Sequence, residues 1–505
     1  MTNEKDTAAQ ETAQTLAERG NNRSHSPKSK EFREFIGQDW APRGPGPARS
    51  AAADYTPARR EALAQLFPGE RLVLPAGDLK VRSNDTDYRF RAHSAFSHMT
   101  GLGGEDEPGA VLVLNPTAAG HEATLYFHPR ASRSAEEFYA DPRHGEFWVG
   151  ARLSAEEMHT LTGIKVAHID TMKDALAKDL GADQVRIRVM PQADESVSAL
   201  VAELRASAGL SEDAEQADIE LATAASELRL RKDAYEVSEM RKAIDVTHQG
   251  FTEMIRAIPA AVQHWRGERI IEGAFGAHAR AEGNGLGYET IAASGNHANT
   301  LHWITNNGKV REGDLILIDA GAEVDSLYTA DITRTLPVSG KFSPVQREVY
   351  DAVLAACETA LAAANEPGVR FRDVHAAAMQ TIAEHLERWG ILPVSAEESL
   401  AGTAQYHRRW MPHGTSHHLG IDVHDCAQAK RELYQDAVLE PGMIFTIEPG
   451  LYFREDDLKV PEQFRGIGVR IEDDILITEH GAERLSESIP RTADEVEEWM
   501  ARILG

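Results

Sequence analysis

The chain has 505 residues, and 53 Lys and Arg against 80 Asp and Glu give it a formal net charge of −27. A surface this acidic repels phosphate backbones and anionic membranes, which excludes a protein that binds nucleic acid over its whole surface. The composition, 42% hydrophobic and 26% charged, is typical of a soluble globular protein with roughly two to four domains.

The N-terminal segment, residues 1–45, predicts no regular element. It begins polar and low in aromatics and ends rich in Pro, Gly and Ala, so we expect a disordered tail. It contains no apolar core of a signal peptide, and the chain has no run of 18 apolar residues. With two cysteines only, Cys357 and Cys426, the sequence predicts a cytoplasmic protein without a membrane segment.

Residues 46–225 predict an N-terminal α/β domain. A short amphipathic helix at 58–67 precedes apolar strands at 68–78, 109–116 and 123–129. Further along, Ser154 is followed three residues later by Glu157, which is the capping box of a helix. Because strands and helices alternate here, we expect an α/β fold.

Residues 226–505 predict a second domain. A long helical stretch at 194–247 leads into it, and a helix is expected at 343–364. Its strands bear acidic residues, and two acidic strand pairs, at 314–335 and 443–477, each follow a helical stretch. This approximate repeat of a helical stretch followed by an acidic strand pair is consistent with an internal duplication.

Four carboxylates lie in apolar strands of this domain: Asp319, Asp331, Glu448 and Glu472. Asp319 ends an apolar run, and Asp331 follows twelve residues later across an expected hairpin, so the two should lie on neighbouring strands. A buried carboxylate is costly unless it is paired or binds a metal. The alternatives are an ion pair with Arg334 and, since Arg470 and Glu472 share one strand face, a pair within that strand.

Five histidines cluster at His407, His413, His417, His418 and His424, where Gly414 and Gly420 favour a loop or irregular strand over a helix. A single histidine is more often structural, but a cluster of this density favours a site, because imidazole is both a metal ligand and an acid/base group. Buried like charges placed together need a cation, and two divalent ions would neutralise the four carboxylates. A donor set with one imidazole and no thiolate favours manganese, with cobalt or zinc as substitutes.

Five motifs together resemble the ligand set of the pita-bread metallopeptidases: IDAG with Asp319, ADITRT with Asp331, HGTSH with His417, TIEPG with Glu448 and VRIEDD with Glu472. The resemblance spans about residues 58–500. The stretches SGNHANTLHW, EPGLYF, VPEQFRGIGVRIEDDILIT and the N-terminal VRSNDTDYRFRAHSAFSHMTGL are most similar to bacterial aminopeptidase P. This implies an N-terminal α/β domain followed by a pita-bread (creatinase/aminopeptidase-like) catalytic domain.

The resemblance implies two divalent metal ions as cofactors. Asp331 and Glu472 would bridge the ions, Asp319 would bind one of them, and His417 and Glu448 would bind the other. A bridging hydroxide would attack the scissile carbonyl, with Glu448 as general base.

The resemblance also assigns residues around the metals. His424 would stabilise the developing oxyanion, and His413 would shuttle protons or orient neighbouring groups. Tyr288, His302 and Arg470 would complete the substrate pocket around a proline ring, with His302 and Arg470 also expected to assist catalysis. For Tyr288 and His302, ordinary packing is the alternative.

The implied function is release of the N-terminal residue from peptides with proline in second position, whose tertiary amide has no N–H. Prolidase, which shares the ligands but cuts only dipeptides, is the nearest alternative. Creatinase-type hydrolases lack the metals, and non-catalytic pita-bread modules typically lose ligands. Besides such peptides we expect no nucleic-acid or membrane partner, and the resemblance implies a homodimer or homotetramer.

The sequence departs from the family in three places. The spacing of twelve between Asp319 and Asp331, where many relatives have eleven, predicts an extra residue in the hairpin loop. The long N-terminal tail is not a general family feature. Ser97 stands where some relatives have an aromatic residue, which puts in doubt an aromatic wall contributed by the N-terminal domain.

Overall fold

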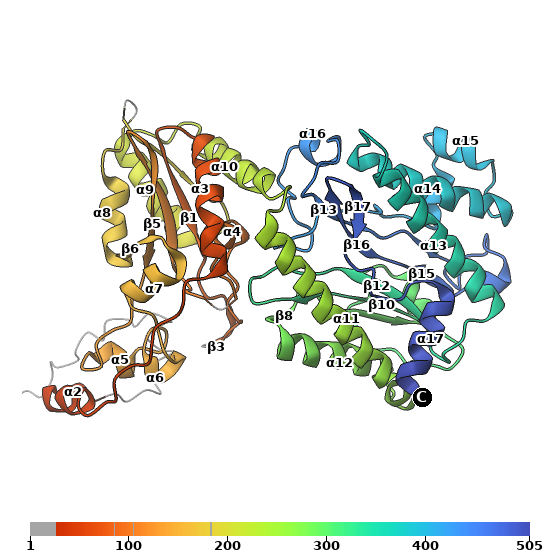
Figure 1. Cartoon of the computed structure of the whole chain (residues 1–505), viewed down its shortest axis with the longest axis horizontal. Coiled ribbons are helices and arrows are strands. Elements are labelled where there is room, and N and C mark those ends of the chain that lie inside the picture. Colours follow the sequence, from red (N-terminus) through yellow and green to blue (C-terminus); the bar gives the residue numbers. More distant parts are fainter. Residues whose placement is uncertain (1–26, 85, 105, 182–183) are drawn as a thin grey trace, which may run out of the picture. The chain divides into compact units, whose positions relative to one another are not determined.

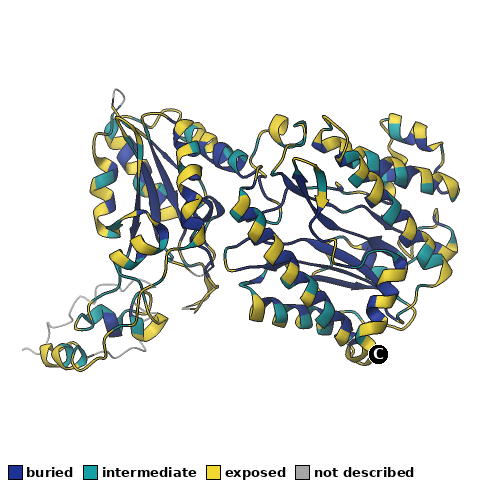
Figure 2. Cartoon of the chain, viewed as in Figure 1, coloured by how far each residue is buried: buried dark blue, intermediate teal, exposed yellow. Residues whose placement is uncertain are grey.

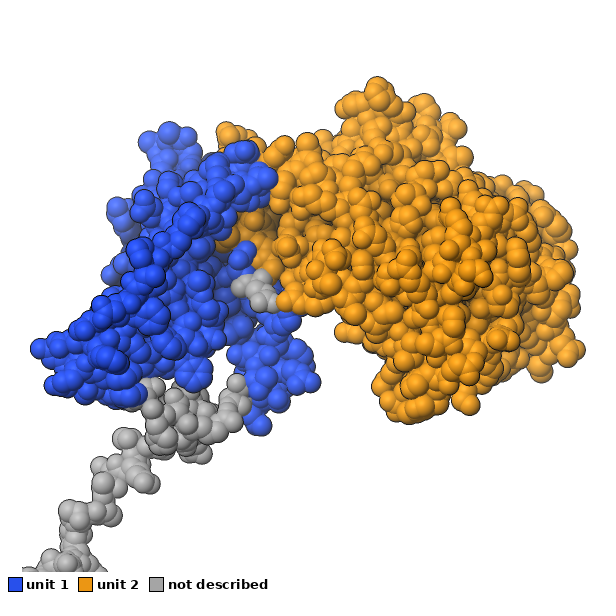
Figure 3. All heavy atoms as spheres, turned by 60° about the horizontal axis from the view of Figure 1, so that its bottom comes forward, with its two compact units in different colours: residues 1–54, 67–96, 105–214 blue, residues 55–66, 97–104, 215–505 orange. Residues whose placement is uncertain are grey.

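The computed structural model describes residues 27–505 except 85, 105 and 182–183. The chain divides into two compact units, coloured separately in Figure 3. Unit 1 comprises residues up to 54, 67–96 and 105–214, and unit 2 comprises 55–66, 97–104 and 215–505. Within the described residues, no helix combines the length and the apolar character that a membrane crossing needs.

Unit 1 contains a five-stranded sheet in the order β6-β5-β4-β1-β7. The central strands pair antiparallel, while β7 and β6 add to β1 and β5 in parallel. The strands expected at 68–78, 109–116 and 123–129 form β1, β4 and β5, so the predicted α/β character is confirmed. The bounds are β1 Glu70–Pro75, β4 Val111–Thr117, β5 Gly120–Phe127, β6 Lys165–His168 and β7 Arg186–Val189, with a small ribbon of β2 Val81–Ser83 and β3 Thr86–Asp87.

Short helices surround this sheet, and the predicted capping box is present at the start of α7. The Ser154 hydroxyl accepts the backbone N–H of Glu157 at 3.2 Å, and the Glu157 carboxylate accepts the N–H of Ser154 at 2.8 Å. The bounds are α2 Lys30–Ile36, α5 Glu136–Ala140, α6 Glu146–Val149, α7 Ala155–Thr162, α8 Met172–Ala177 and α9 Glu195–Ala208; α4, Ser94–Thr100, runs from unit 1 into unit 2.

Part of the segment predicted as a disordered tail is helical. Residues 30–36 form α2, and Phe32 of this helix packs edge-on against Tyr139, with ring centroids 5.1 Å apart. This aromatic contact is the physical reason for the difference, because it buries apolar surface that the polar composition of the segment does not suggest. Residues 1–26 of the predicted tail lie outside the described residues.

Unit 2 is built on two three-stranded antiparallel sheets, β12-β10-β9 and β13-β16-β17, and two ribbons, β11-β8 and β14-β15. Apart from β17 at the edge of its sheet, these strands are almost wholly buried (Figure 2). Their bounds are β8 Gly285–Leu286, β9 Ile291–Ser294, β10 Leu315–Ala320, β11 Ala322–Glu323, β12 Ile332–Pro337, β13 Ile444–Ile447, β14 Gly450–Tyr452, β15 Gly468–Arg470, β16 Asp473–Thr478 and β17 Gly481–Arg484.

Helices lie outside these strands (Figure 1). The helix expected at 343–364 is α13, which begins after Ser343, whose hydroxyl accepts the N–H of Gln346. The bounds are α3 Thr56–Gln65, α10 Ala214–Leu228, α11 Ala234–Gln263, α12 Gly267–Glu282, α13 Pro344–Ala364, α14 Phe371–Arg388, α15 Ala396–Ala401, α16 Arg431–Tyr434 and α17 Ala493–Leu504.

The helical stretch expected at 194–247 consists of three helices, α9, α10 and the first half of α11. The helix α10 ends at Leu228 and α11 begins at Ala234, where Asp233 forms a capping box. Arg59 of α3 donates to Asp233 at 2.9 Å, which ties α3 to α11 within unit 2. The division expected at 225/226 stays a prediction, although three segments counted with the N-terminal domain group with unit 2: 55–66, 97–104 and 215–225.

Candidate metal centre

Asp319 and Asp331 meet because β10 and β12 pair antiparallel, as the expected hairpin requires. Asp319 lies near the end of β10, opposite Thr333, and Asp331 stands directly before β12. Arg334 does not neutralise either carboxylate. Its buried guanidinium donates instead to Asp473 at 2.7 Å and to backbone carbonyls.

The two glutamates come from the other sheet. Glu448 directly follows β13, and Glu472 lies between β15 and β16. The Thr333 hydroxyl donates to Glu472 at 2.6 Å and so links the two halves of the site. Arg470 ends β15 and pairs with Asp319, so the structure does not form the alternative ion pair between Arg470 and Glu472.

The histidine-rich segment is a loop, as its glycines predicted. His413, His417 and His424 line the same pocket as the carboxylates. His407 is buried elsewhere and contacts Ser399, while His418 stacks on Phe371 with ring centroids 4.6 Å apart. Three of the five clustered histidines therefore reach the site.

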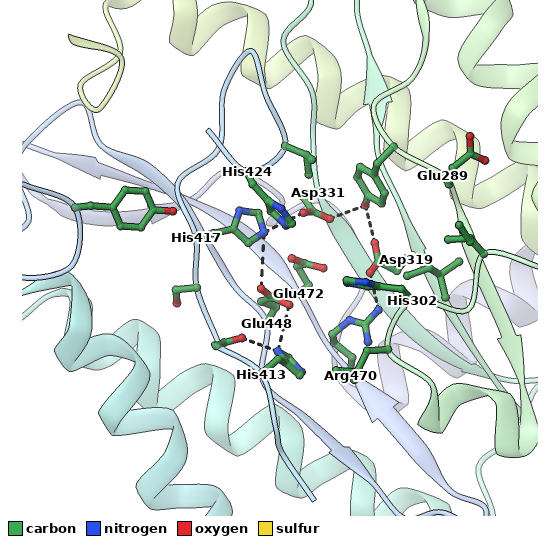
Figure 4. Close-up of a pocket in the computed structure, with 18 residues that line it drawn as sticks. Glu289, His302, Asp319, Asp331, His413, His417, His424, Glu448, Arg470 and Glu472 are labelled. Atoms are coloured by element: carbon green, nitrogen blue, oxygen red, sulfur yellow. Dashed lines mark hydrogen bonds and ion pairs between the residues drawn. The ribbon is translucent and has the colours of Figure 1, made fainter. Parts of the chain in front are cut away.

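The pocket has a volume of about 560 Å³. Figure 4 shows the side chains that line it, including carboxylates in or beside strands of both sheets and imidazoles from loops. All ten residues that the family resemblance assigned to the site lie here: Tyr288, His302, Asp319, Asp331, His413, His417, His424, Glu448, Arg470 and Glu472.

The closest donor group in the pocket consists of Asp331, His417 and Glu472, with one ligand atom of each within 4.8 Å of the others. His417 Nε2 lies 3.2 Å from Asp331 Oδ2 and 3.7 Å from a Glu448 oxygen. Its Nδ1 lies 3.1 Å from the carbonyl oxygen of His418, which can only accept a hydrogen bond. The proton therefore belongs on Nδ1, and Nε2 faces the carboxylates as a metal ligand would.

A tyrosine hydroxyl bridges the first two carboxylates. Tyr288 Oη lies 2.6 Å from Asp319 Oδ1 and 2.5 Å from Asp331 Oδ1, and Arg470 lies 2.5 Å from Asp319 Oδ2. The hydroxyl has one proton to give, so two ionised carboxylates cannot both accept from it. Burial raises the pKa of Asp319 against the opposing charge of Arg470, which is consistent with a carboxyl that shares a proton here.

The two glutamates of the site are also buried beside other carboxylates, with too little positive charge nearby to balance them. Burial, reinforced by Asp331, raises the pKa of Glu448 to about 8, although the nearby imidazole opposes it. Burial together with the charges of Asp331 and Glu448 raises the pKa of Glu472 well above its usual range. The hydrogen bond to Asp331 and the charge of Glu448 outweigh burial and raise the pKa of His417 to about 9. Divalent cations fit this donor set, because they would replace the protons that such a cluster otherwise holds.

Three contacts in and around the pocket were not foreseen in the sequence. The hydroxyl of Tyr452 lies 2.7 Å from His413 Nε2 and accepts a hydrogen bond from Arg470 at 3.1 Å, so it joins two predicted residues. Leu301 and Ile304 form an apolar part of the lining on either side of His302. No sequence signal separates such a tyrosine or leucine from a core residue, because its role depends on partners far away in the chain.

Comparison with known proteins agrees with this geometry. The metallopeptidase family M24 matches residues 238–479, and the aminopeptidase P N-terminal domain matches residues 56–188. Xaa-Pro aminopeptidase 2 of Streptomyces coelicolor is 49% identical over 460 residues, which cover 91% of this chain and 93% of that protein.

Solved structures give the same result. A variant of Escherichia coli aminopeptidase P in complex with substrate matches with a TM-score of 0.77 and 31% identity, covering 90% of this chain and 99% of that chain. The zinc-substituted E. coli enzyme in complex with product matches with a TM-score of 0.76, at the same identity and coverage.

Fold and site therefore define a metallopeptidase with an N-terminal α/β domain and a pita-bread catalytic domain. More specifically, the chain belongs to the aminopeptidase P family of M24 metallopeptidases.

Proposed function

We propose that this protein is an Xaa-Pro aminopeptidase that works with two divalent metal ions, manganese in the first place and cobalt or zinc as substitutes. The observation that supports this most is the convergence in one pocket of four carboxylates, which lie in or beside strands of two sheets, and four imidazoles from loops. Membership of the aminopeptidase P family supplies the substrate class.

For the metals, we assign Asp331 and Glu472 as ligands shared by both ions. Asp319 would serve one ion, and His417 and Glu448 the other, consistent with the position of His417 Nε2 near both Asp331 and Glu448. When bound, two such ions would lower the pKa of water towards about 7 and polarise the scissile carbonyl.

The surrounding residues would move protons and stabilise charge. Glu448, at the pocket wall, would take the proton of the attacking water. His424 packs edge-on against His417, with ring centroids 4.4 Å apart, and would donate a hydrogen bond to the developing oxyanion. Burial and the charge of Arg470 lower the pKa of His413 to about 3, so His413 is neutral and can pass a proton through its contact with Tyr452.

The pocket also offers a place for the proline ring. Leu301, Ile304 and Val423 give it an apolar wall, and His302 lies between the first two. The free α-amino group of the substrate would bind near Asp319, which restricts cleavage to amino termini. An X-Pro amide has no N–H, so recognition must come from ring packing rather than from a hydrogen bond at that position.

The test is an assay of Arg-Pro-Pro, Arg-Ala-Pro and Gly-Pro with protein that has been stripped with chelator and reloaded with manganese. We expect release of arginine from Arg-Pro-Pro alone, and only with metal. Cleavage of Gly-Pro alone would identify a prolidase, and metal binding without cleavage of any of the three would remove the proline assignment.

The assembly and location are further proposals. We propose a homo-oligomer, dimer or tetramer, in the cytoplasm. Both cysteines are buried and free of disulfide bonds, which suits a reducing compartment. Light scattering of the purified protein measures the oligomeric state directly.

A further inference from the structure

Residues 295–309, here called the 295–309 loop, follow strand β9 and form one wall of the pocket. Leu301, His302 and Ile304 of this loop line the pocket, and Figure 4 shows His302 beside Asp319. His302 and Ile304 are exposed, and apart from the short 3₁₀ turn Gly295–Asn299 the loop has no regular structure. Its conformation must therefore be fixed by contacts at its base.

Those contacts converge on one buried carboxylate, Glu268, in the first turn of α12. The side chain of Glu268 is fully buried, with an exposed fraction of 0%. Its Oε1 accepts the backbone N–H of Ser294 at 2.9 Å and contacts His297 Nδ1 at 2.7 Å. Its Oε2 accepts the indole N–H of Trp303 at 2.9 Å and the backbone N–H of Gly308 at 2.6 Å.

The four donors bracket the whole loop. Ser294 precedes it, Gly308 lies near its end, and His297 and Trp303 lie between, with their rings stacked 3.9 Å apart. The backbone N–H of Glu268 also donates to the carbonyl of Gly308 at 3.2 Å. Each oxygen of this buried carboxylate has two hydrogen-bonding partners, so the group needs no metal. This suits a structural anchor.

The space at Gly308 shows how close this approach is. A Cβ added there would lie 2.6 Å from His297 Nδ1 and 2.7 Å from Glu268 Cδ. Only glycine lets the backbone reach the carboxylate at this point. Asn306, also fully buried, fixes the same end through Thr290 and Ala292.

We propose that Glu268 is the positioning residue of substrate recognition: by holding Trp303 and Gly308 it places Leu301, His302 and Ile304 against the substrate. This inference rests on the proposed peptidase function. Glu268 itself is absent from the pocket lining, so its effect is exerted through the loop and not on the metal ligands.

Glu268→Gln is the informative substitution. All four partners are donors, and the amide nitrogen of glutamine is a donor too, so either orientation of the amide loses two of the four bonds. We expect KM for Arg-Pro-Pro to rise about tenfold or more, with a smaller change in kcat and an unchanged metal content. Glu268→Asp, which keeps the carboxylate but shortens its reach, should recover part of the loss.

A readout independent of activity is hydrogen exchange of the peptide that spans 294–308, followed by mass spectrometry. Glu268→Gln should speed its exchange, whereas Glu272→Gln on the same helix is the matched control and should change neither exchange nor KM. If Glu268→Gln is poorly folded, Trp303→Phe removes one donor and keeps the aromatic ring, so a smaller shift in the same direction is expected.

Two results for Glu268→Gln would overturn the proposal. Faster hydrogen exchange with an unchanged KM would show that the loop has no role in recognition. Unchanged exchange would show that Glu268 does not hold the loop. If the unmodified protein does not cleave Arg-Pro-Pro, the proposed function fails and recognition of this substrate class fails with it. The exchange comparison still decides whether Glu268 holds the loop.

Discussion

Asp331 contacts two members of the candidate metal centre, each through a different carboxylate oxygen. One of its oxygens lies 2.5 Å from the hydroxyl of Tyr288 and the other lies 3.2 Å from His417 Nε2, while its backbone N–H donates to Asp474. A carboxylate between two partners in this way suits a ligand that two metal ions share.

Asp331→Ala should therefore abolish metal uptake. Outer partners of metal ligands typically contribute about 10–100-fold to affinity, so loss of a shared ligand should cost more than about a hundredfold in metal affinity and in rate. Elemental analysis after dialysis measures the first and the Arg-Pro-Pro assay the second. Asp325→Ala, in the same hairpin but exposed, is the control, and retention of two ions by Asp331→Ala would refute the assignment.

A second prediction at this scale concerns His375, beneath the histidine-rich loop. Burial, and then the charge of Arg408, lower its pKa from the ordinary 6.5 to about 4. Its Nε2 lies 3.2 Å from Arg408, and its Nδ1 accepts the backbone N–H of Thr415 at 3.2 Å and lies 3.0 Å from the hydroxyl of that residue. Donors therefore face both ring nitrogens, which disfavours the doubly protonated ring.

Between pH 6.5 and 4 the folded protein binds fewer protons at His375 than the unfolded chain does. The contribution of His375 to the free energy of unfolding is therefore fully present above pH 6.5 and is lost as the pH falls towards 4. His375→Gln removes the titration and should flatten this pH dependence. Urea unfolding of metal-free protein at several pH values measures it. An equally steep loss in the variant would assign the effect to other groups.

At the scale of the element, β12 is held to β16 by a buried charge as well as by packing. The guanidinium of Arg334 has an exposed fraction of 0%. It donates to the Asp473 carboxylate at 2.7 Å, to the Glu472 carbonyl at 2.6 Å and to the Pro490 carbonyl at 2.8 Å. The position of Glu472 in the pocket thus depends on a side chain that does not enter the pocket.

Arg334→Ala should lower the free energy of unfolding by about 3–5 kcal/mol, because it leaves the Asp473 carboxylate and several carbonyls buried without this partner. Chemical denaturation measures the change. Arg241→Ala, which removes a half-exposed ion pair with Glu483, is the matched control and should change stability little. A similar effect of both variants would contradict the argument.

At the scale of the whole molecule, metal binding should stabilise unit 2 in particular, because all the candidate ligands belong to it. Ions that bind only the folded state add about 2.7 kcal/mol at a free concentration of 100 times their Kd. Chelation should therefore lower the Tm of unit 2, and manganese should restore it.

Calorimetry with and without chelator, combined with hydrogen exchange of peptides from each unit, measures this effect. In the Asp331→Ala variant the metal-dependent shift should vanish. A shift confined to unit 1, or one that persists in the variant, would place the metal elsewhere.

The sequence by itself determined the α/β character, the capped helices α7 and α13, and the hairpin that brings Asp319 beside Asp331. These depend on local signals, such as capping residues, apolar runs and the spacing within one hairpin. It also indicated ten of the eighteen residues that line the pocket, although the five candidate metal ligands rest on motifs that gain meaning only in combination.

Tertiary structure decided what local signals cannot express. It paired Arg470 with Asp319 instead of its strand neighbour Glu472, and it directed Arg334 to Asp473. It also joined Glu268 to Gly308, forty residues away, as the base of the 295–309 loop. The choice among buried partners depends on which strands meet, and the cost of leaving a buried charge unpaired enforces that choice only once the chain is folded.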